Sequence, residues 1–532
     1  MQKIKVGIFF AVFALCVQAV YAQSWQFVGP RAMGMGGAAV ATAYGPDAQY
    51  WNPAGLTQDE NVNETGFLIN AGVSLESSKN ILEVVKSLND MSDQYKNLSN
   101  AIQNNSNINA ENISTIFAGL DDISQLVTNK TGALVNADAG LGFKFKNIYV
   151  GMRTLGTGAV RPVIDTNNVQ FNAAGAGLNI TATAGTAVPT DPDNATSAAN
   201  LAAAMGAQGN AFVQNLINLL GNPAGVSDET ELANLIINAI VQYYPATTPA
   251  QITEAVNTAI ENMGGAATVV NMAGAGTGSY KDNETVAMAD VAAFGEAAIG
   301  YGRKIIPGLK VGGNVKVLSG YVAESGVMIL SDNEKFEDIL DKANDNKQQT
   351  TTWAVDFGAL VNFSDLFGKK IPWNPQAGLT ARNVNGPKFD RPAPPTGTNP
   401  AVVANWNSDK YQLKPQIRAG VAANPLKWIT IAADFDVTEN DTLLDNIKSR
   451  QLAFGVEFNL VNGQKFNMPL RLGYNKNLAE SSLCPFYTAG IGFNMVHFFV
   501  ELAGAISTKT TKLEDKTIPN SAAAALTLGF LF

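Results

Sequence analysis

The sequence predicts an all-β fold, a transmembrane antiparallel β-barrel of about fourteen strands. Hydrophobic residues make up 46% of the chain and charged residues only 15%, whereas soluble domains carry roughly 25% charged residues. No apolar run of about 18 residues follows the first 22 residues, so no transmembrane helix is predicted. Apolar residues instead alternate with polar ones over segments of roughly ten residues, as in strands with one lipid-facing side and one luminal side.

The clearest of these strands lies at the C-terminus, where Ala524, Leu526 and Leu528 share one face and Thr527 lies on the other. The same alternation recurs along the second half of the chain. The predicted strands are 66–76, 137–145, 148–155, 292–301, 308–320, 353–363, 376–384, 415–423, 428–437, 451–459, 468–476, 486–493, 498–506 and 521–532. Most have the length of about 9–11 residues that a tilted strand needs to cross a bilayer.

Short and long connections alternate between the predicted strands. Turn-forming pairs such as Lys146-Asn147 and Pro307-Gly308 are short, whereas the polar stretches 387–413 and 438–450 are long. Periplasmic turns and extracellular loops alternate in this way in outer-membrane barrels. An even strand number then places both ends of the chain on the periplasmic side.

Two insertions interrupt the barrel, at about 77–130 and 156–290. The second is rich in Ala, Asn and Gly, and three helices are predicted in it. One starts at Ser227 with acidic residues in its first turn, and another begins with Thr248-Pro249-x-Gln251, a capping pattern with proline at the first helical position. By strand parity both insertions are extracellular, and we expect a small helical cap over the barrel mouth.

Aromatic residues are predicted to form two girdles where the strands meet the lipid headgroups. The predicted periplasmic girdle contains Phe363, Trp373, Trp428, Phe458, Phe493, Phe498 and Phe532. The predicted opposite girdle contains Tyr321, Trp353, Tyr411, Tyr474 and Tyr487.

The first 22 residues have the features of a secretory signal peptide, with Lys3 and Lys5 before an apolar run and Val20-Tyr-Ala22 at the cleavage site. The mature chain then carries 34 basic and 45 acidic residues, and Cys484 is its one thiol. An acidic chain without a basic cluster argues against nucleic-acid binding. The predicted location is the outer membrane of a Gram-negative type of cell, as a multi-pass barrel in contact with lipid.

Enzymatic chemistry has little material in this sequence. His497 is the single histidine, and neither a Gly-x-Ser-x-Gly elbow nor a phosphate-binding loop is present. A serine–histidine triad or a histidine metal site is therefore not expected, and the sequence predicts no enzyme, no cofactor and no metal. Asp434 and Asp436 resemble cation ligands, but two acids without a third ligand are weak evidence for a site.

Ionisable residues recur on the predicted luminal face. The candidates are Asp138, Lys144, Arg153, Glu296, Lys310, Lys316, Asp356, Arg382, Arg418, Asp434, Asp436, Glu457, Arg471 and Glu501. A lumen tolerates such charges, whereas each Lys or Arg at the lipid midplane would cost roughly 2–4 kcal/mol. Two interpretations stay open: opposite charges pair across the lumen and anchor an internal segment, or they form a polar track that guides a ligand.

The N-terminal motif resembles the plug of the FadL-type outer-membrane barrels, a superfamily that includes TraF-like and PorV-like proteins. Its elements are the turn Gly34-Met-Gly36-Gly37-Ala, then Asp47, then Asn52-Pro53-Ala54. Gly34-x-Gly36-x-x-Ala39 also fits a loose dinucleotide fingerprint, but Pro30 interrupts the strand that this fingerprint needs before it. Segment 377–389 also resembles the TraF-like branch.

Two terminal features follow from the resemblance. Residues 23–60 would form a plug inside a barrel made by residues 61–532, with Gly36 and Gly37 allowing close backbone approach and Asn52-Pro53 fixing a rigid turn. The C-terminal residues Leu526, Leu528, Phe530 and Phe532 resemble the signal that the barrel-assembly machinery reads.

The resemblance implies a FadL-like, porin-like channel for small hydrophobic molecules that is gated by the plug. The alternative is a barrel that does not transport and binds a partner in secretion or conjugation, as PorV-like and TraF-like proteins do. The large Ala- and Asn-rich insertion suits docking of a protein partner. The residues themselves do not separate these two functions.

Overall fold

The computed structural model describes residues 25–57, 65–77, 132–165, 167–168, 184–219, 222–273, 282–328, 339–444, 447–463, 466–481, 483–513 and 516–531, together with Phe117, Asp121 and Ser124. The predicted signal peptide, Phe532 and nearly all of the predicted insertion 77–130 lie outside the described residues. Among the described residues, no helix is long and apolar enough to cross a membrane.

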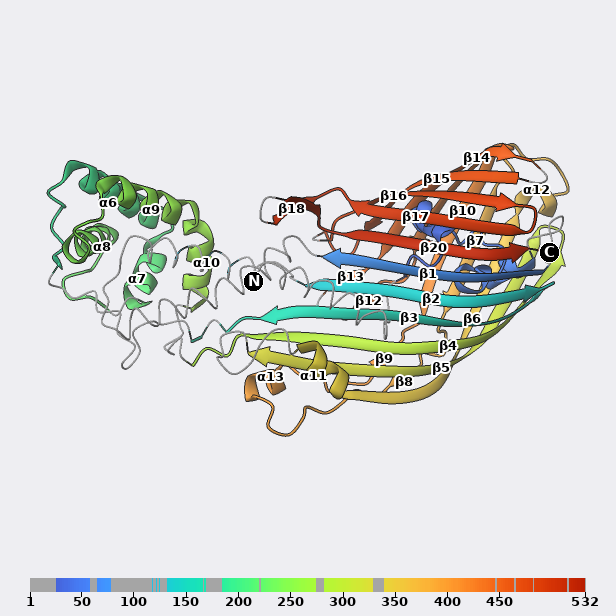
Figure 1. The fold of residues 1–532 in the computed structure, drawn as a ribbon, viewed down its shortest axis with the longest axis horizontal. Coiled ribbons are helices and arrows are strands. Elements are labelled where there is room, and N and C mark those ends of the chain that lie inside the picture. The colour runs from blue at the N-terminus through green and yellow to red at the C-terminus, as the bar shows by residue number, and fades with distance from the viewer. Residues whose placement is uncertain are drawn as a thin grey trace.

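Fourteen strands close into an antiparallel barrel, in which β20 pairs with β1 (Figure 1). The barrel strands are β1 (Thr65–Ser77), β2 (Ala133–Phe145), β3 (Ile148–Val163), β4 (Val286–Ile306), β5 (Leu309–Met328), β6 (Lys347–Asn362), β7 (Gln376–Arg382), β10 (Gln416–Leu426), β11 (Ile429–Asp436), β14 (Gln451–Asn462), β15 (Phe466–Asn477), β16 (Phe486–Met495), β17 (Phe498–Ser507) and β20 (Ala522–Leu531). Each predicted strand overlaps one of these, so the fold class and strand number are confirmed.

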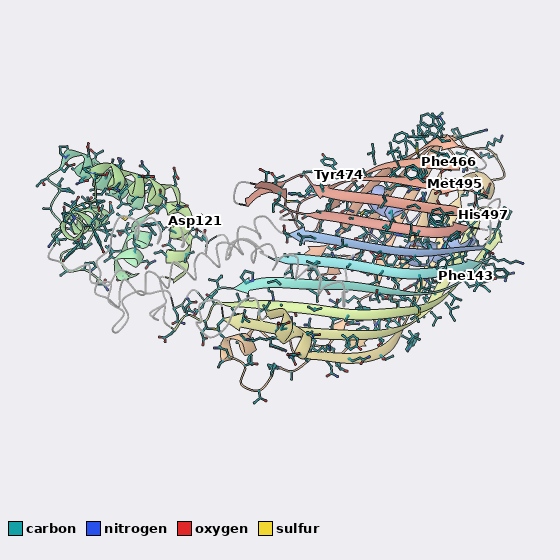
Figure 2. The ribbon with its side chains drawn as sticks, viewed as in Figure 1. Asp121, Phe143, Phe466, Tyr474, Met495 and His497 are labelled. Atoms are coloured by element: carbon teal, nitrogen blue, oxygen red, sulfur yellow. The ribbon has the colours of Figure 1, made fainter. Side chains whose placement is uncertain are left out.

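The side chains of each strand alternate between an apolar outer face and a polar inner face. Ile299 and Val421 on the outer wall are 63% and 57% exposed, whereas Lys316 and Asp356 on the inner wall are fully buried. Figure 2 shows Phe143, Phe466 and Met495 on the wall toward the end where the short turns lie. This pattern is that of a barrel with lipid outside, and the protein is a multi-pass barrel of the Gram-negative outer membrane.

Strands β3 to β6 extend further than predicted at the end opposite the short turns, so the second insertion begins after Val163 and ends before Val286. The extension lacks the alternation of a lipid-facing strand because both of its faces are covered. The outward Ala287 and Ala289 pack against α11 (Ile339–Asp345), and the inward face packs against α13 (Pro400–Ala404). Strand β7 is instead shorter than predicted and ends before Asn383, whose φ is +52°.

The second insertion contains five helices in residues 184–273, where three were predicted: α6 (Pro192–Ala207), α7 (Asn210–Leu219), α8 (Glu229–Tyr243), α9 (Pro249–Glu261) and α10 (Met263–Ala273). The capping box at Thr248 and Gln251 is confirmed at the start of α9. These helices share a hydrophobic core and lie beyond the barrel end opposite to the short turns (Figure 1). We call them the helical bundle.

The remaining described elements are short and lie in the connections. They are α12 (Phe363–Leu366) and three two-stranded hairpins, β8–β9 (Lys388–Phe389 with Tyr411–Gln412), β12–β13 (Asn440–Asp441 with Lys448–Ser449) and β18–β19 (Thr510–Leu513 with Lys516–Pro519). The hairpins lie in the long connections, at the same end of the barrel as the helical bundle.

Candidate functional site: a luminal segment and its anchors

Residues 25–57 lie inside the barrel, and we call them the luminal segment. The segment contains two short helices, α2 (Pro30–Gly34) and α3 (Ala48–Trp51), and a 3-10 helix, η1 (Pro53–Thr57). Nearly all of its side chains are buried. Helix α2 contacts β15, β16, β17 and β20, and η1 contacts β4, β5 and β6 on the other side of the barrel. The segment therefore crosses the lumen from one wall to the other.

Inward-facing glycines on seven strands between β5 and β16 let the luminal segment lie directly on the barrel wall. This glycine belt consists of Gly312, Gly358, Gly378, Gly420, Gly455, Gly473 and Gly490. A Cβ at Gly473 would collide with the backbone of Met35 and Gly36, and Gly36 itself has a φ of +67°. The predicted close approach at Gly36 is therefore matched by glycines on the wall, which the sequence analysis missed.

Two residues of the sequence motif hold the segment by hydrogen bonds. The Asn52 side-chain amide donates to the carbonyl oxygens of Val40, at 3.1 Å, and Ala359 on β6, at 3.0 Å. Its Oδ1 accepts the Ala54 N–H at 3.1 Å. Asp47 is bonded to Asn70 at 3.1 Å and to Arg153 at 3.4 Å. The motif thus ties the segment to β1, β3 and β6.

Asp434 on β11 anchors the middle of the segment. Its Oδ2 accepts the backbone N–H groups of Ala39 and Val40, both at 2.8 Å. Arg418 lies 3.7 Å from Asp434 and 3.4 Å from Asp436. The two aspartates considered as a cation site therefore serve a backbone turn and an arginine, and no group of three potential metal ligands is found within the described part of the chain.

Apart from the half-buried Lys310, the predicted inward charges are buried, and most of them pair with one another. Lys316 lies 3.1 Å from Asp356 and 3.4 Å from Glu296, and Arg382 lies 3.7 Å from Glu296. On the opposite wall Arg471 contacts Glu457 at 2.7 Å and Glu501 at 2.8 Å. These contacts support the interpretation of paired, anchoring charges.

Arg31, in the luminal segment, joins the ion pairs around Arg471. Its Nε lies 3.1 Å from Glu457, and its Nη1 donates to the Thr42 carbonyl oxygen at 2.8 Å. Arg31 was not predicted because it lies outside the strands, where no alternation indicates which way a side chain points.

A further group of charges, which was not predicted, lies closer to the helical bundle. Arg391 reaches Asp290 on β4 at 3.0 Å and Glu324 on β5 at 3.3 Å. The predicted strand boundaries excluded Asp290 and Glu324, and Arg391 belongs to the long connection between β7 and β10. These ion pairs bind that connection to the inner wall.

Three aromatic rings of the luminal segment pack together beneath arginine side chains. Trp25 stacks on Trp51 with 5.9 Å between ring centroids, and Tyr50 meets both rings edge-on. The Arg382 guanidinium lies 3.9 Å from the centre of the Tyr50 ring, and Arg418 lies 5.4 Å from that of Trp25. Such contacts hold a cation against the faces of aromatic rings.

The aromatic rings continue into an apolar cluster toward the mouth of the barrel. We call the following residues the mouth cluster: Leu134, Leu155, Phe294, Leu318, Phe389, Tyr411, Leu413, Leu443, Leu444, Ile447 and Leu483. Several come from the long connections, which fold inward over the lumen. Tyr411 was predicted in the outer girdle, but it is 4% exposed and stacks on Phe294. That prediction was wrong because the β8–β9 hairpin turns inward.

The outer wall carries an apolar groove of about 490 Å³ across β6, β7, β10, β11 and β14. Its lining residues are Ala359, Val361, Ala377, Gly378, Leu379, Ala419, Gly420, Val421, Ala433, Asp434, Phe435 and Leu452. Small side chains make the wall thin here. Val40 of the luminal segment lies directly behind it, because Cβ atoms at Gly378 and Gly420 would contact Val40.

Three solved structures are similar to this chain over nearly its whole length at low sequence identity. The toluene transporter TodX from P. putida is 8% identical, with 96% of this chain and 99% of that chain covered at a TM-score of 0.39. A FadL homologue from Pseudomonas aeruginosa is 8% identical, with coverages of 97% and 100% and a TM-score of 0.38. The monoaromatic hydrocarbon channel CymD is 9% identical, with coverages of 95% and 97% and a TM-score of 0.38.

A comparison with curated proteins gives no match. One family model, described as "F plasmid transfer operon, TraF, protein", matches residues 49–436. The match begins in the luminal segment and runs to the end of β11, which is well over half of the chain. The chain therefore belongs to this TraF family.

Proposed function

We propose that the protein is an outer-membrane channel that passes small hydrophobic molecules, with the luminal segment as its plug. The observation that carries this proposal is the mouth cluster. It is a buried apolar surface that begins in the inward-folded connections and continues to Trp25, Tyr50 and Trp51. Binding sites for small molecules are mostly apolar, with a few convergent polar groups. Arg382 and Arg418 are polar groups of this kind, at the inner end of the cluster.

The plug role is supported by the way the luminal segment fills the barrel. Its backbone lies on the glycine belt, and charged side chains reach it from β3, β11 and β14. A ligand that moves past this segment must shift it or leave the lumen beside it. That shift breaks hydrogen bonds and ion pairs to the wall and exposes buried apolar side chains of the segment, such as Met35 and Trp51. Cys484 is free, so no disulfide among the described residues opposes the shift.

The proposal is tested by uptake of a radiolabelled aromatic hydrocarbon and a radiolabelled long-chain fatty acid into intact cells that carry the protein. We expect saturable uptake by the full chain. Leu444→Asp should abolish it, because the new carboxylate would lie in the mouth cluster, whereas Val188→Asp, at an exposed position, should not. Uptake that is no faster than in cells without the protein, for both compounds, would refute transport.

A second function is favoured by one observation. The helical bundle has its own core, and residues 184–273 contain seven acidic residues but no Lys, Arg or His. A self-contained acidic module suits docking of a basic partner protein, and the family description names a plasmid transfer operon. If uptake is absent, a pull-down with the full chain and with a chain lacking residues 184–273 distinguishes partner binding from no function of the bundle.

A further inference from the structure

An arc of exposed basic residues lies around the short-turn end of the barrel. Lys146 lies in the β2–β3 turn, Arg303 near the end of β4, Lys369 and Lys370 in the connection after α12, and Lys427 in the β10–β11 turn. We call these five residues the basic rim. They follow consecutive strands of the barrel from β2 to β11, so they form one continuous arc.

Among the described residues, no acid lies close enough to pair with the charges of this arc. None of the five rim residues has a carboxylate within 4.0 Å in the described part of the chain. Among the described residues of the short connections, Asp365 is the one acid. The strand ends here are also far from the buried ion pairs of the lumen, so the rim charges are available to an external partner.

Interfacial aromatic and apolar side chains lie between the rim charges. On the outer face of β4, Tyr301, which is 52% exposed, is followed by Arg303. Lys427 precedes Trp428, which is 45% exposed, and Trp373, at 65%, follows Lys370. Tyr and Trp rings lie at the headgroup level of membranes, and long basic side chains extend from there to the phosphates.

We propose that the basic rim binds the anionic phospholipid headgroups of the leaflet at the short-turn end of the barrel. The position of the rim decides between a lipid and an acidic protein as the partner. Arg303 shares the outer face of β4 with the exposed Tyr301, and the Trp428 ring packs 6.3 Å from that of Phe458 on β14. Both residues therefore lie at the edge of the apolar wall, where lipid headgroups would be their nearest neighbours. The acidic helical bundle at the opposite end disfavours the other leaflet, because like charges repel.

The test measures quenching of tryptophan fluorescence by brominated lipid in nanodiscs that contain the full chain. Brominated phosphatidylglycerol and brominated phosphatidylcholine are compared at equal mole fraction, and Trp373 and Trp428 report from the rim itself. One basic residue near an anionic surface contributes about 1 kcal/mol, which corresponds to about a fivefold preference. We therefore expect the anionic lipid to be preferred at least about fivefold.

Two charge variants identify the residues responsible. In the rim variant, Lys146, Arg303, Lys369, Lys370 and Lys427 are all changed to Gln, and we expect its lipid preference to fall to about one. In the control variant, the exposed residues Lys347, Lys388, Lys410, Lys476 and Lys509, all toward the other end, are changed to Gln. It carries the same net charge and should keep the preference.

The proposal is overturned if the unmodified protein shows no preference, or if both variants lose it equally. A salt titration of the unmodified protein gives an independent result if the rim variant does not fold. At 1 M salt, screening acts over about 3 Å, so the preference should disappear. A preference unchanged by salt would contradict headgroup binding.

Discussion

Replacing Asp434 by alanine should release the luminal segment from the wall while the barrel stays folded. The Asp434 carboxylate accepts two backbone N–H groups of the luminal segment, from Ala39 and Val40. Alanine removes both bonds at the point where the segment passes behind the thin wall of the outer groove. The strand pairing of β11 does not depend on this side chain, because it is made by backbone groups.

The size of the effect follows from the two lost bonds. A hydrogen bond to a charged group contributes roughly 1.5–3 kcal/mol, so the lower limit for two is about 3 kcal/mol. Since about 1.4 kcal/mol corresponds to a factor of ten, the population with a displaced segment should rise by about 100-fold. Arg418 keeps a partner in the variant, because Asp436 lies 3.4 Å from it.

Single-channel recording in planar bilayers measures the displaced population as the frequency of open events. Asp436→Ala is the matched control, since Asp436 is equally buried and also pairs with Arg418 but makes no described hydrogen bond to the luminal segment. We expect frequent openings for Asp434→Ala and few for Asp436→Ala. Equal opening frequencies in the two variants, with both barrels folded by gel mobility, would refute the anchoring role of Asp434.

Three further predictions concern the glycine belt, the helical bundle and the loss of hydrogen bonds to Asp165 at low pH. Gly473→Val should expose the luminal segment to protease, because its Cβ would collide with the segment backbone, whereas Gly504→Val, whose nearest neighbour is at 3.7 Å, should leave it protected. Thr248→Ala removes the cap of α9 and costs roughly 1 kcal/mol, so the bundle should melt about 4–8 °C lower by circular dichroism. Burial raises the pKa of Asp165, but hydrogen bonds, first that from the Glu284 N–H, lower it by more, so the pKa lies below its usual value. The stabilisation from this carboxylate is therefore complete above about pH 4 and is lost as the pH falls through the lowered pKa. Amide exchange at Glu284 should become faster only under those acidic conditions.

The strands were predictable because lipid imposes a simple rule on half of their residues. Wherever the outer face meets lipid, apolar and polar residues must alternate, and the predicted and observed strands agree there. The rule fails at Ala287 and Ala289, which face outward but are covered by α11. It also fails at Tyr411, since a hairpin that folds into the lumen has the composition of an exposed loop. Contacts between segments distant in the chain decide such positions, and a single sequence does not report them.

Individual residues of the candidate site were predictable from the sequence, but the contacts between them were not. Alternation identified Asp434 and Arg471 as inward, and the resemblance identified Asn52 as part of a rigid turn. Which groups meet depends on how the luminal segment runs across the barrel, so the bond from Ala39 to Asp434 and the ion pair of Arg31 with Glu457 followed only from the structure. The glycine belt left a signal in the sequence, namely glycines at inward positions of most strands from β5 to β16.

The ion pairs that hold the luminal segment differ around the barrel, and this difference predicts which part of the segment moves first. Near β14 and β15, Glu457 is bonded to both Arg31 and Arg471 within 3.1 Å. Near β2 and β3, Arg153 reaches Asp47 only at 3.4 Å, and Arg153 Nε and Nη1 and Asp138 Oδ2 are buried without a hydrogen-bond partner in the structure. An unsatisfied buried polar group costs about 1–3 kcal/mol. Unsatisfied atoms also occur at the other anchors, on Arg418, Asp434 and Arg471. The ion pair between the luminal segment and the wall is nevertheless longer at β3 than at β14, so we predict that the segment leaves the β3 wall before the β14 wall.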